Sequence, residues 1–346
     1  MAASCVGIDL GHSQIKIVKL IRHGRTIQLE EAICLPTPEN SVVQGRITNE
    51  DSIVDVLYRL DSEVLKAPKV VMGISSPDVV VKEKRFPVMP LKELRQVIEH
   101  ELKDFFEFEF NSLDEVSFSF EEIRRDKEID VLIVGCHRQL ISPFITIARR
   151  VGLNLSVIDL PVFSFNRLTR NALSVKPCYI DIGSRQTKIY IKDNGAFSVY
   201  RLIPIGGDHI TEAIMNAYQV ELEEAEQLKR TKEIDRIILD AEFDKSRVRM
   251  VMQQLVNNIY HTLDYLRASE RASSISEVVD QVFVCGGTAV LKGLDQIFSD
   301  EFGVSTKVLE PFKDFQADSL DPNAIDNTIF SAATALALRG LEEREN

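Results

Sequence analysis

With 346 residues, the chain is long enough for two domains, and its 45% hydrophobic and 27% charged content is ordinary for a globular protein. The net charge of −12, without a run of Lys or Arg, argues against a nucleic-acid surface or an anionic-membrane surface. No stretch approaches the roughly 18 apolar residues of a membrane span, and no basic region opens a signal peptide. We therefore expect a cytoplasmic protein without direct membrane insertion, and five scattered cysteines fit buried thiols in a reducing compartment.

The first 78 residues predict the element order β-β-β-α-β. Three buried strands are expected over residues 6–10, 15–21 and 26–34. A helix over 51–66 follows, because its apolar residues recur at helical spacing along one face. A fourth apolar strand over 69–74 ends at the polar turn around Pro77.

Residues 79–152 change in character and are interpreted as an inserted small α+β subdomain. The expected elements are a strand, a helix, two strands and a closing helix, over 79–86, 91–106, 116–120, 129–135 and 140–151. Four phenylalanines crowd the middle of this segment, at Phe105, Phe106, Phe108 and Phe110. We expect them to form the core of the insert, although a partner-binding aromatic patch fits the same pattern.

The second half opens with a strand, a polar Gly turn and a second strand across 179–190. A strand over 197–205 then leads into Gly206-Gly207, and helices are expected over 208–218, 221–232 and 246–267. An apolar strand that starts at Val282 enters a second Gly-Gly turn, followed by a helix over 291–301. A loop-like stretch, 311–322, precedes the final helix.

The strand–turn–strand motif occurs twice, around Asp9 and around Asp181, which are 172 residues apart in a chain of 346. Aligning these two residues matches Ile8 with Ile180, Gly11 with Gly183, Gln14 with Gln186, Lys16 with Lys188 and Ile17 with Ile189. A repeat at half the chain length indicates two related domains that face each other. One such hairpin alone would fit an ordinary β-hairpin with an Asp-x-Gly turn as well as a binding site, and the matched pair favours the binding site.

Two facing turns of this kind suit a nucleotide. Backbone N–H groups that point out of a Gly turn bind phosphate, and an adjacent carboxylate can hold a hydrated Mg²⁺ that bridges to the phosphates. Asp9 and Asp181 are therefore the candidate metal-binding and catalytic residues. The candidate phosphate-binding residues are Gly11, His12, Ser13, Gln14 and Lys16 in the first turn, and Gly183, Ser184, Arg185, Gln186 and Thr187 in the second.

These motifs resemble the phosphate loops of the actin, Hsp70 and sugar-kinase ATPase superfamily, and residues 282–294 resemble its adenosine-contacting element. The resemblance implies an α/β fold of duplicated actin-like (ribonuclease H-like) domains, with ATP and Mg²⁺ in a nucleotide cleft between the halves. It also implies an adenosine pocket lined by Gly206, Gly207, Glu226, Lys229, Gly286, Gly287 and Thr288. Glu226 and Lys229 lie three residues apart, so a surface ion pair is the alternative to this role.

Within this superfamily, the chain resembles the PilM family of type IV pilus machines along nearly its whole length. FtsA-like cell-division proteins carry a similar insert. The similar segments are 85–90, 114–116, 148–153, 157–159, 201–207, 225–229, 310–312 and 335–341. The resemblance implies a first actin-like domain from 1–78, 153–178 and 327–346, an inserted subdomain at 79–152, and a second actin-like domain at 179–326.

By this resemblance, the chain is an ATP-binding cytoplasmic adaptor of type IV pilus assembly, recruited to the inner face of the cytoplasmic membrane. Such proteins bind the N-terminal cytoplasmic tail of an inner-membrane PilN-like partner as an extended peptide, between the insert and the N-terminal subdomain. Val80, Phe86 and Phe110 are candidates for its side-chain pockets, although each suits a core position equally well. Acidic residues of the insert suit a basic residue of the peptide, and a homo-oligomer stays open.

Other functions were weighed against this one. A GspL-like component of type II secretion stays open, although such proteins normally carry a membrane helix and degenerate phosphate loops. An FtsA-like filament-forming ATPase is disfavoured by the acidic residues 341–346, because FtsA-like chains end in a basic amphipathic anchor. A small-molecule kinase would need a carboxylate base, which we cannot identify, and an Hsp70-type chaperone would need a substrate-binding domain.

The segment between the halves predicts slow hydrolysis. Many relatives place an acidic or amide side chain there to orient the attacking water, but the aligned residue in this chain is Pro161. Proline offers no side-chain hydrogen bond. Asp159 could substitute only if its carboxylate pointed into the cleft, which strand alternation leaves open.

Overall fold

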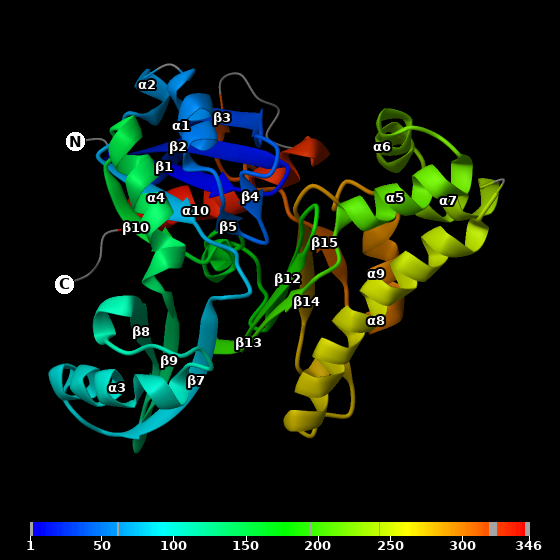
Figure 1. Cartoon of the computed structure of the whole chain (residues 1–346). Coiled ribbons are helices and arrows are strands. Elements are labelled where there is room, and N and C mark those ends of the chain that lie inside the picture. Colours follow the sequence, from blue (N-terminus) through cyan, green and yellow to red (C-terminus); the bar gives the residue numbers. More distant parts are fainter. Residues whose placement is uncertain (1–2, 61, 194–195, 242, 318–323, 343–346) are drawn as a thin grey trace.

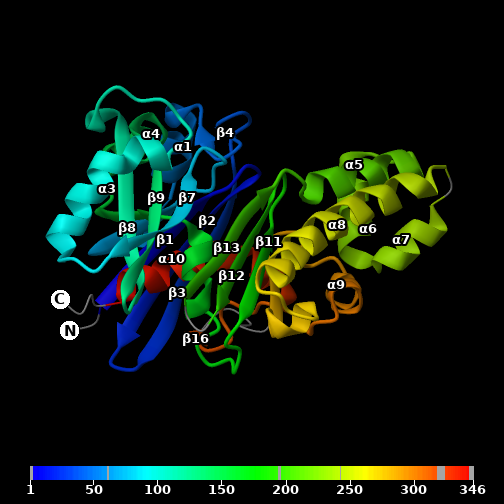
Figure 2. The ribbon, with the colours of Figure 1, turned by 90° about the horizontal axis from the view of Figure 1, so that it is seen from below.

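The computed structural model describes residues 3–60, 62–193, 196–241, 243–317 and 324–342. Figures 1 and 2 show two α/β halves side by side, with a smaller unit attached to the first half. The acidic residues 343–346 and part of the loop expected over 311–322 lie outside the described residues. Within these ranges, no helix combines the length and the apolar character that a membrane crossing requires.

The first large sheet has six strands in the order β10-β6-β1-β2-β3-β16. These strands are β1 (Ala3–Leu10), β2 (Gln14–His23), β3 (Thr26–Pro36), β6 (Lys69–Gly73), β10 (Leu155–Asp159) and β16 (Gln316–Ala317). A small hairpin, β4 (Val42–Val43) and β5 (Arg46–Ile47), follows β3. The single helix predicted over 51–66 is two helices: α1 (Glu50–Tyr58), capped by the Asn49 side chain, and the short α2 (Ser62–Leu65).

Helix α10 (Ser331–Leu341) lies directly on β1, because small residues let the two backbones approach. A Cβ on Gly7 would collide with the carbonyl oxygen of Ala333 and would meet the Ala337 nitrogen at 2.5 Å. A Cβ on Gly340 would collide with the Sγ of Cys5. The last helix of the chain is therefore part of the first half, next to the strand that carries Asp9.

The inserted segment forms a three-stranded sheet in the order β7-β9-β8, from β7 (Val80–Pro87), β8 (Val116–Arg125) and β9 (Glu128–His137). Helix α3 (Leu91–Phe105) and the turn η1 (Leu113–Glu115) complete it. Phe105, Phe106 and Phe110 are buried in its core, and the Phe106 ring lies against Gly135. This confirms the prediction that the phenylalanines form a core, not an exposed patch.

Helix α4 (Arg138–Val151) differs from the expectation that it closes the insert. Its apolar face belongs to the core of the first half, through Leu140, Phe144, Ile147 and Ala148. It packs beside α1, and Arg150 pairs with Asp51 there at 2.6 Å. The amphipathic pattern predicted the helix correctly, but such a pattern does not say which of two neighbouring cores the face will join.

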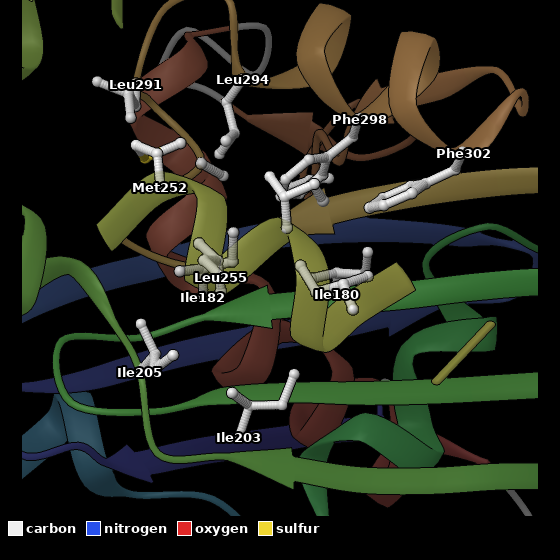
Figure 3. Close-up of a cluster of buried hydrophobic side chains, with 14 of the residues drawn as sticks. Ile180, Ile182, Ile203, Ile205, Met252, Leu255, Leu291, Leu294, Phe298 and Phe302 are labelled. Carbon is white, nitrogen blue, oxygen red and sulfur yellow. The ribbon is translucent and has the colours of Figure 1, made fainter. Parts of the chain in front are cut away.

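The second large sheet has five strands in the order β13-β12-β11-β14-β15. They are β11 (Pro177–Ile182), β12 (Thr187–Asp193), β13 (Ala196–Ile203), β14 (Gln281–Cys285) and β15 (Thr306–Val308). The helices are α5 (Gly207–Tyr218), α6 (Leu222–Thr231), α7 (Ile234–Asp240), α8 (Lys245–Ser269), η3 (Ile275–Glu277) and α9 (Leu294–Phe302). Figure 3 shows α8 and α9 covering this sheet, with Leu255 and Phe298 pointing to Ile180 and Ile182.

Two segments tie the halves together. Strand β16 pairs with β3 of the first sheet, although residues 316–317 fall within the range expected for the second domain. The turn η2 (Pro161–Arg167) places Phe163 between the sheets, with its ring 5.1 Å from that of Tyr190 and 5.7 Å from that of Tyr200. The turn η4 (Ile325–Phe330) then leads the chain back into α10.

Candidate functional site

The first hairpin joins β1 to β2 and places a charged pair at the end of the sheet. Asp9 lies directly opposite Lys16 in the antiparallel register, and the Lys16 ammonium is 3.3 Å from the Asp9 carboxylate. Gly11 closes the turn by donating its N–H to the carbonyl of Gln14 at 3.0 Å. A Cβ on Gly11 would lie 2.9 Å from the Lys16 Nζ, so the turn and the ammonium are in contact.

The second hairpin, from β11 to β12, repeats this geometry. Asp181 lies opposite Lys188, and their charged groups are 2.8 Å apart in a more buried setting. Gly183 donates its N–H to the Gln186 carbonyl at 3.0 Å, as Gly11 does in the first turn. The repeat seen in the sequence is therefore a repeat in structure.

Lys188 is the site residue that the sequence analysis missed. Burial alone would lower its pKa, but the carboxylates of Asp181 and Asp9 outweigh burial and raise the pKa above its ordinary value. Asp9 belongs to the first hairpin, so the two hairpins lie close enough for one ammonium to interact with both carboxylates. The signal was available, because the repeat aligns Lys188 with Lys16, but only Lys16 was assigned to the site.

Side chains of both turns make further contacts beside this charged centre. The Gln186 side chain donates to the carbonyl of Ser75, which follows β6 in the first half, at 2.9 Å. His12, in the first turn, has its Nδ1 2.7 Å from the Val42 carbonyl. The Gln186 contact thus joins the second turn to the first half, and the His12 contact holds the first turn within that half, while Ser13 is exposed.

The side chains of the second turn are mostly engaged by the protein itself. Arg185 pairs with Asp208 of α5 at 2.9 Å. Burial raises the pKa of Asp208, and Arg185 opposes that effect. The Thr187 hydroxyl is fully buried and donates to the carbonyl of Ile205 at 2.7 Å. Any ligand contact from Thr187 would therefore come from its backbone.

Helix α5 begins against the second turn. Gly207 donates its N–H to the Gly183 carbonyl, and Asp208 donates to the Ser184 carbonyl, both at 2.8 Å. A Cβ on Gly206 would lie 2.5 Å from both of those carbonyl oxygens. Glycine is required here because no side chain fits between the start of the helix and the turn.

A polar cluster with one buried ammonium lies beside Gly207. Lys229 of α6 donates to Glu226 at 2.6 Å and to the Thr211 hydroxyl at 2.7 Å. Burial opposes ionisation of Glu226, but the hydrogen bonds from Lys229 and Thr211 hold its pKa below the usual range. A Cβ on Gly207 would collide with the Oγ1 of Thr288. Glu226 and Lys229 are thus a partly buried pair within the cluster, unlike an ordinary surface pair.

The second Gly-Gly turn differs between its two glycines. Gly286 has φ of +90°, and a Cβ there would lie 2.5 Å from the Asp181 carboxylate, so this position needs glycine on both counts. Gly287 has open space around it, with nothing within 4 Å of a Cβ. Thr288 donates its N–H to the Ile182 carbonyl at 3.2 Å. The predicted residues of the three motifs are therefore brought together around Asp181.

Asp159 does not point toward this site. Its carboxylate accepts hydrogen bonds from the Leu160 N–H at 2.8 Å and the Ser164 hydroxyl at 3.2 Å, and it lies 3.7 Å from Arg339. Burial raises the pKa of Asp159 above its ordinary value, against the opposing effect of Arg339. Pro161 packs instead on Gly73, the neighbour of Asp9 in the sheet.

A separate groove of about 660 Å³ lies between the insert and the first half. One wall is β8, an edge strand of the insert sheet, and another is β10, an edge strand of the six-stranded sheet. Phe118, Phe120 and Phe163 supply apolar surface, and Asp159 lies in the polar part of the lining. The groove thus has two strand edges that have no strand partner among the described residues.

The residues suggested for the pockets of a bound peptide do not line this groove. Phe86 and Phe110 are in the core of the insert, only 5% and 7% exposed, and Val80 packs against that core. The inner surface comes from β8 and β10 because sheet order, which single-strand patterns do not reveal, makes these two strands edges.

Comparison with known proteins gives partial matches to cell-division proteins. FtsA of Pseudomonas aeruginosa is 23% identical over 235 residues, which cover 63% of this chain and 55% of FtsA. FtsA of Bacillus subtilis is 22% identical over 199 residues, covering 53% of this chain and 45% of that protein. The chain spans about half the length of these two relatives.

Solved structures match over nearly the whole chain. A chain of a PilM–PilN type IV pilus biogenesis complex has a TM-score of 0.82 at 22% identity, covering 98% of this chain and 99% of that one. MreB5 of Spiroplasma citri bound to AMPPNP has a TM-score of 0.52 at 15% identity, covering 95% and 94%. These likenesses confirm the predicted actin-like fold. A family model described as type IV pilus assembly protein PilM matches residues 7–341, and this chain therefore belongs to the PilM family of type IV pilus assembly proteins.

Proposed function

We propose that this chain binds ATP with Mg²⁺ between its two hairpins and acts as an adaptor in type IV pilus assembly. The observation that carries the nucleotide part is the matched pair of Asp–Lys hairpins, whose aspartates both act on Lys188. The fold is shared with MreB5 of Spiroplasma citri, whose structure contains AMPPNP. Asp9 and Asp181 are the proposed metal-binding and catalytic residues.

The residues present fit such a ligand. Carboxylates beside Gly turns suit hydrated Mg²⁺, which when bound neutralises the phosphate charge. Lys16 and Lys188 each neutralise one carboxylate in the protein alone. Lys16, the more exposed of the two, would turn to a phosphate oxygen, while Lys188 would stay the buried counter-ion of Asp181. Glu226, Lys229 and the open backbone at Gly287 would orient the adenosine, together with Gly206, Gly207 and Thr288.

The proposed partner is the N-terminal cytoplasmic tail of a PilN-like inner-membrane protein, bound in the groove. The similar solved chain comes from a PilM–PilN complex. An extended peptide can add to a free strand edge by main-chain hydrogen bonds, while pockets receive alternate side chains. The groove offers two such edges, β8 and β10, and the carboxylate of Glu121, which unlike Asp159 is not held by Arg339, would suit a basic residue of the tail.

This proposal also assigns the domains and the location. We propose that residues 79–152 are the insert, between a first actin-like domain formed by 1–78, 153–178 and 327–346 and a second at 179–326. Binding to a membrane protein's tail would place the chain at the inner face of the cytoplasmic membrane.

Calorimetric titration with ATP and Mg²⁺ tests the nucleotide site. We expect the Asp9→Ala, Asp181→Ala double variant to lose most of the affinity. The control is Asp104→Ala, Asp235→Ala, which removes two exposed carboxylates elsewhere and should bind as wild type does. Equal affinity in wild type and in a folded Asp9→Ala, Asp181→Ala variant would refute the proposal.

A further inference from the structure

A second cavity, of about 690 Å³, lies next to the peptide groove and has a different lining. It is bounded by the β2–β3 turn, by residues in and after η2, and by the end of α10. Its lining includes four arginines, Arg22, Arg25, Arg167 and Arg170. This concentration of positive charge is unexpected in a chain whose net charge is −12.

The acidic residues of the lining do not neutralise this charge. Asp314 accepts a hydrogen bond from Asn171 at 2.7 Å, and Glu342 pairs with Arg167 at 2.7 Å. The other three arginines, Arg22, Arg25 and Arg170, have no acidic partner among the residues that the structure describes. The cavity, which we call the arginine pocket, therefore has four guanidinium groups and two carboxylates in its lining, and Arg22, Arg25 and Arg170 form no ion pair within the described ranges.

Two buried polar atoms on the same wall also have no hydrogen-bond partner within the described ranges. They are the Nε of Arg167, a donor, and the Oδ1 of Asn166, an acceptor. Leaving a buried donor or acceptor without a partner costs free energy, so each such atom in a native fold needs an explanation. A ligand that satisfies both must carry an acceptor, such as a phosphate oxygen, and a donor, such as a hydroxyl.

We propose that the arginine pocket binds a phosphate ester that carries a free hydroxyl, of the glycerol phosphate class. Guanidinium groups match phosphate oxygens with two parallel hydrogen bonds, and several arginines from separate elements can share one phosphate. The phosphate would contact Arg22, Arg25 and Arg170. The Arg167 Nε and the Asn166 Oδ1 are buried, so they would meet the phosphate and the hydroxyl once their side chains turn toward the pocket. The same chemistry occurs in a free metabolite and in the headgroup of phosphatidylglycerol.

The arginine pocket and the peptide groove share two lining residues, Arg167 and Glu342. Arg167 also donates to Ser164, which in turn donates to Asp159 in the groove. A phosphate in the arginine pocket would compete with Glu342 for Arg167. The two ligands would therefore be neighbours, separated by one ion pair.

Calorimetric titration of the full chain with glycerol phosphate tests this inference. We expect saturable binding that the Arg22→Gln, Arg170→Gln double variant weakens by about tenfold or more, since two charge-assisted contacts are removed. The matched control is Arg236→Gln, Arg249→Gln, which removes the same charge from exposed positions in the second half and should bind like wild type. Lys16→Gln should also bind normally, because it alters only the hairpin site. Thermal melts identify variants that have unfolded, and Arg25→Gln then replaces the double variant.

Vesicle co-sedimentation distinguishes the two sources. Retention by phosphatidylglycerol but not phosphatidylcholine vesicles, lost in the double variant, supports a lipid headgroup, whereas glycerol phosphate binding without vesicle binding supports a free ester. The inference is overturned if glycerol phosphate does not bind at millimolar concentration. It is also overturned if the double variant binds as wild type does, if only Lys16→Gln loses binding, or if a glutamate-rich peptide binds these arginines more tightly. Equal affinity for inorganic sulfate, which has no hydroxyl to donate, would remove the role given to Asn166.

Discussion

At the scale of single residues, Lys188 distinguishes the two hairpins. It forms a 2.8 Å pair with Asp181 in a setting where both side chains are about one-tenth exposed, whereas the Lys16–Asp9 pair is longer, at 3.3 Å, and more exposed. Removing one partner of a buried pair leaves an uncompensated charge, which costs far more than the loss of an accessible pair. The two lysines that the repeat equates should therefore differ in their contribution to stability.

We expect Lys188→Met to lower the free energy of unfolding by about 3–5 kcal/mol, the usual cost of leaving a buried charge unpaired. Lys16→Met should cost less, because the Asp9–Lys16 pair is longer and more exposed and the Lys188 ammonium still acts on the Asp9 carboxylate. Urea denaturation of the two variants measures the difference. Equal losses in the two variants would contradict the assignment of Lys188 as the buried counter-ion.

Asp159 should make stability depend on pH in the acid range. Burial raises its pKa above the value of 3.8 that it has when exposed. Between 3.8 and its folded value the folded chain binds more protons than the unfolded chain, so the contribution of Asp159 to the free energy of unfolding falls as pH rises. Above that interval the loss stays constant.

Asp159→Asn should remove the loss of stability that the Asp159 carboxylate causes above pH 3.8. The free energy of unfolding of the variant should therefore rise relative to that of wild type as pH increases from 3.8. Denaturation curves at a series of pH values measure it, with Asp55→Asn, an exposed carboxylate on α1, as control. A variant that instead loses stability relative to wild type over this interval would contradict the assignment.

At the scale of elements, the sequence predicted the strands, turns and helices that depend on local residue patterns. The two hairpins could be predicted because each reads as two apolar strands joined by a polar Gly turn, and the repeat doubled that information. The packing of α4 could not be predicted, because an apolar helix face does not show which of two neighbouring cores it will join. The groove could not be predicted either, since it depends on β8 and β10 being edge strands.

The insert can be removed cleanly only if α4 stays. Val80, where β7 begins, pairs with Gly135 near the end of β9, so the ends of segment 80–137 are neighbours and a short loop can join them. We expect the chain with 80–137 replaced by such a loop to melt cooperatively, and to lose peptide binding because β8 is gone. Replacement of 79–152 should prevent folding, because it removes Phe144 and Ile147 from the first core. Circular dichroism melts of the two deletions test this, and similar melts would contradict the packing given to α4.

At the scale of the whole molecule, the halves contact each other beside the charged centre, through Gln186 and Ser75. A nucleotide held by both hairpins would fix the angle between the halves. The turn η2 connects β10 of the groove to the second half through the Phe163–Tyr190 contact. A change in the angle between the halves would therefore also change the peptide groove. Nucleotide and partner are therefore expected to influence each other.

We expect ATP turnover to stay below about 1 s⁻¹, the low end of typical enzyme values. The family resemblance puts Pro161 at the position of a water-orienting side chain, and Asp159 is held away by Ser164 and Arg339. Phosphate release under saturating ATP and Mg²⁺ measures the rate. Turnover well above that value in the wild-type chain would show that another residue orients the water.

The central claim is that this PilM-family chain couples a nucleotide site to a groove for an extended tail. Fluorescence anisotropy with the labelled N-terminal tail of the PilN-like partner tests it most directly, with and without ATP and Mg²⁺. We predict saturable binding whose affinity changes with nucleotide in the wild type, and no such change in the Asp9→Ala, Asp181→Ala variant. Absence of binding to the full chain, or undiminished binding after residues 80–137 are replaced in a protein that still folds, would contradict the account.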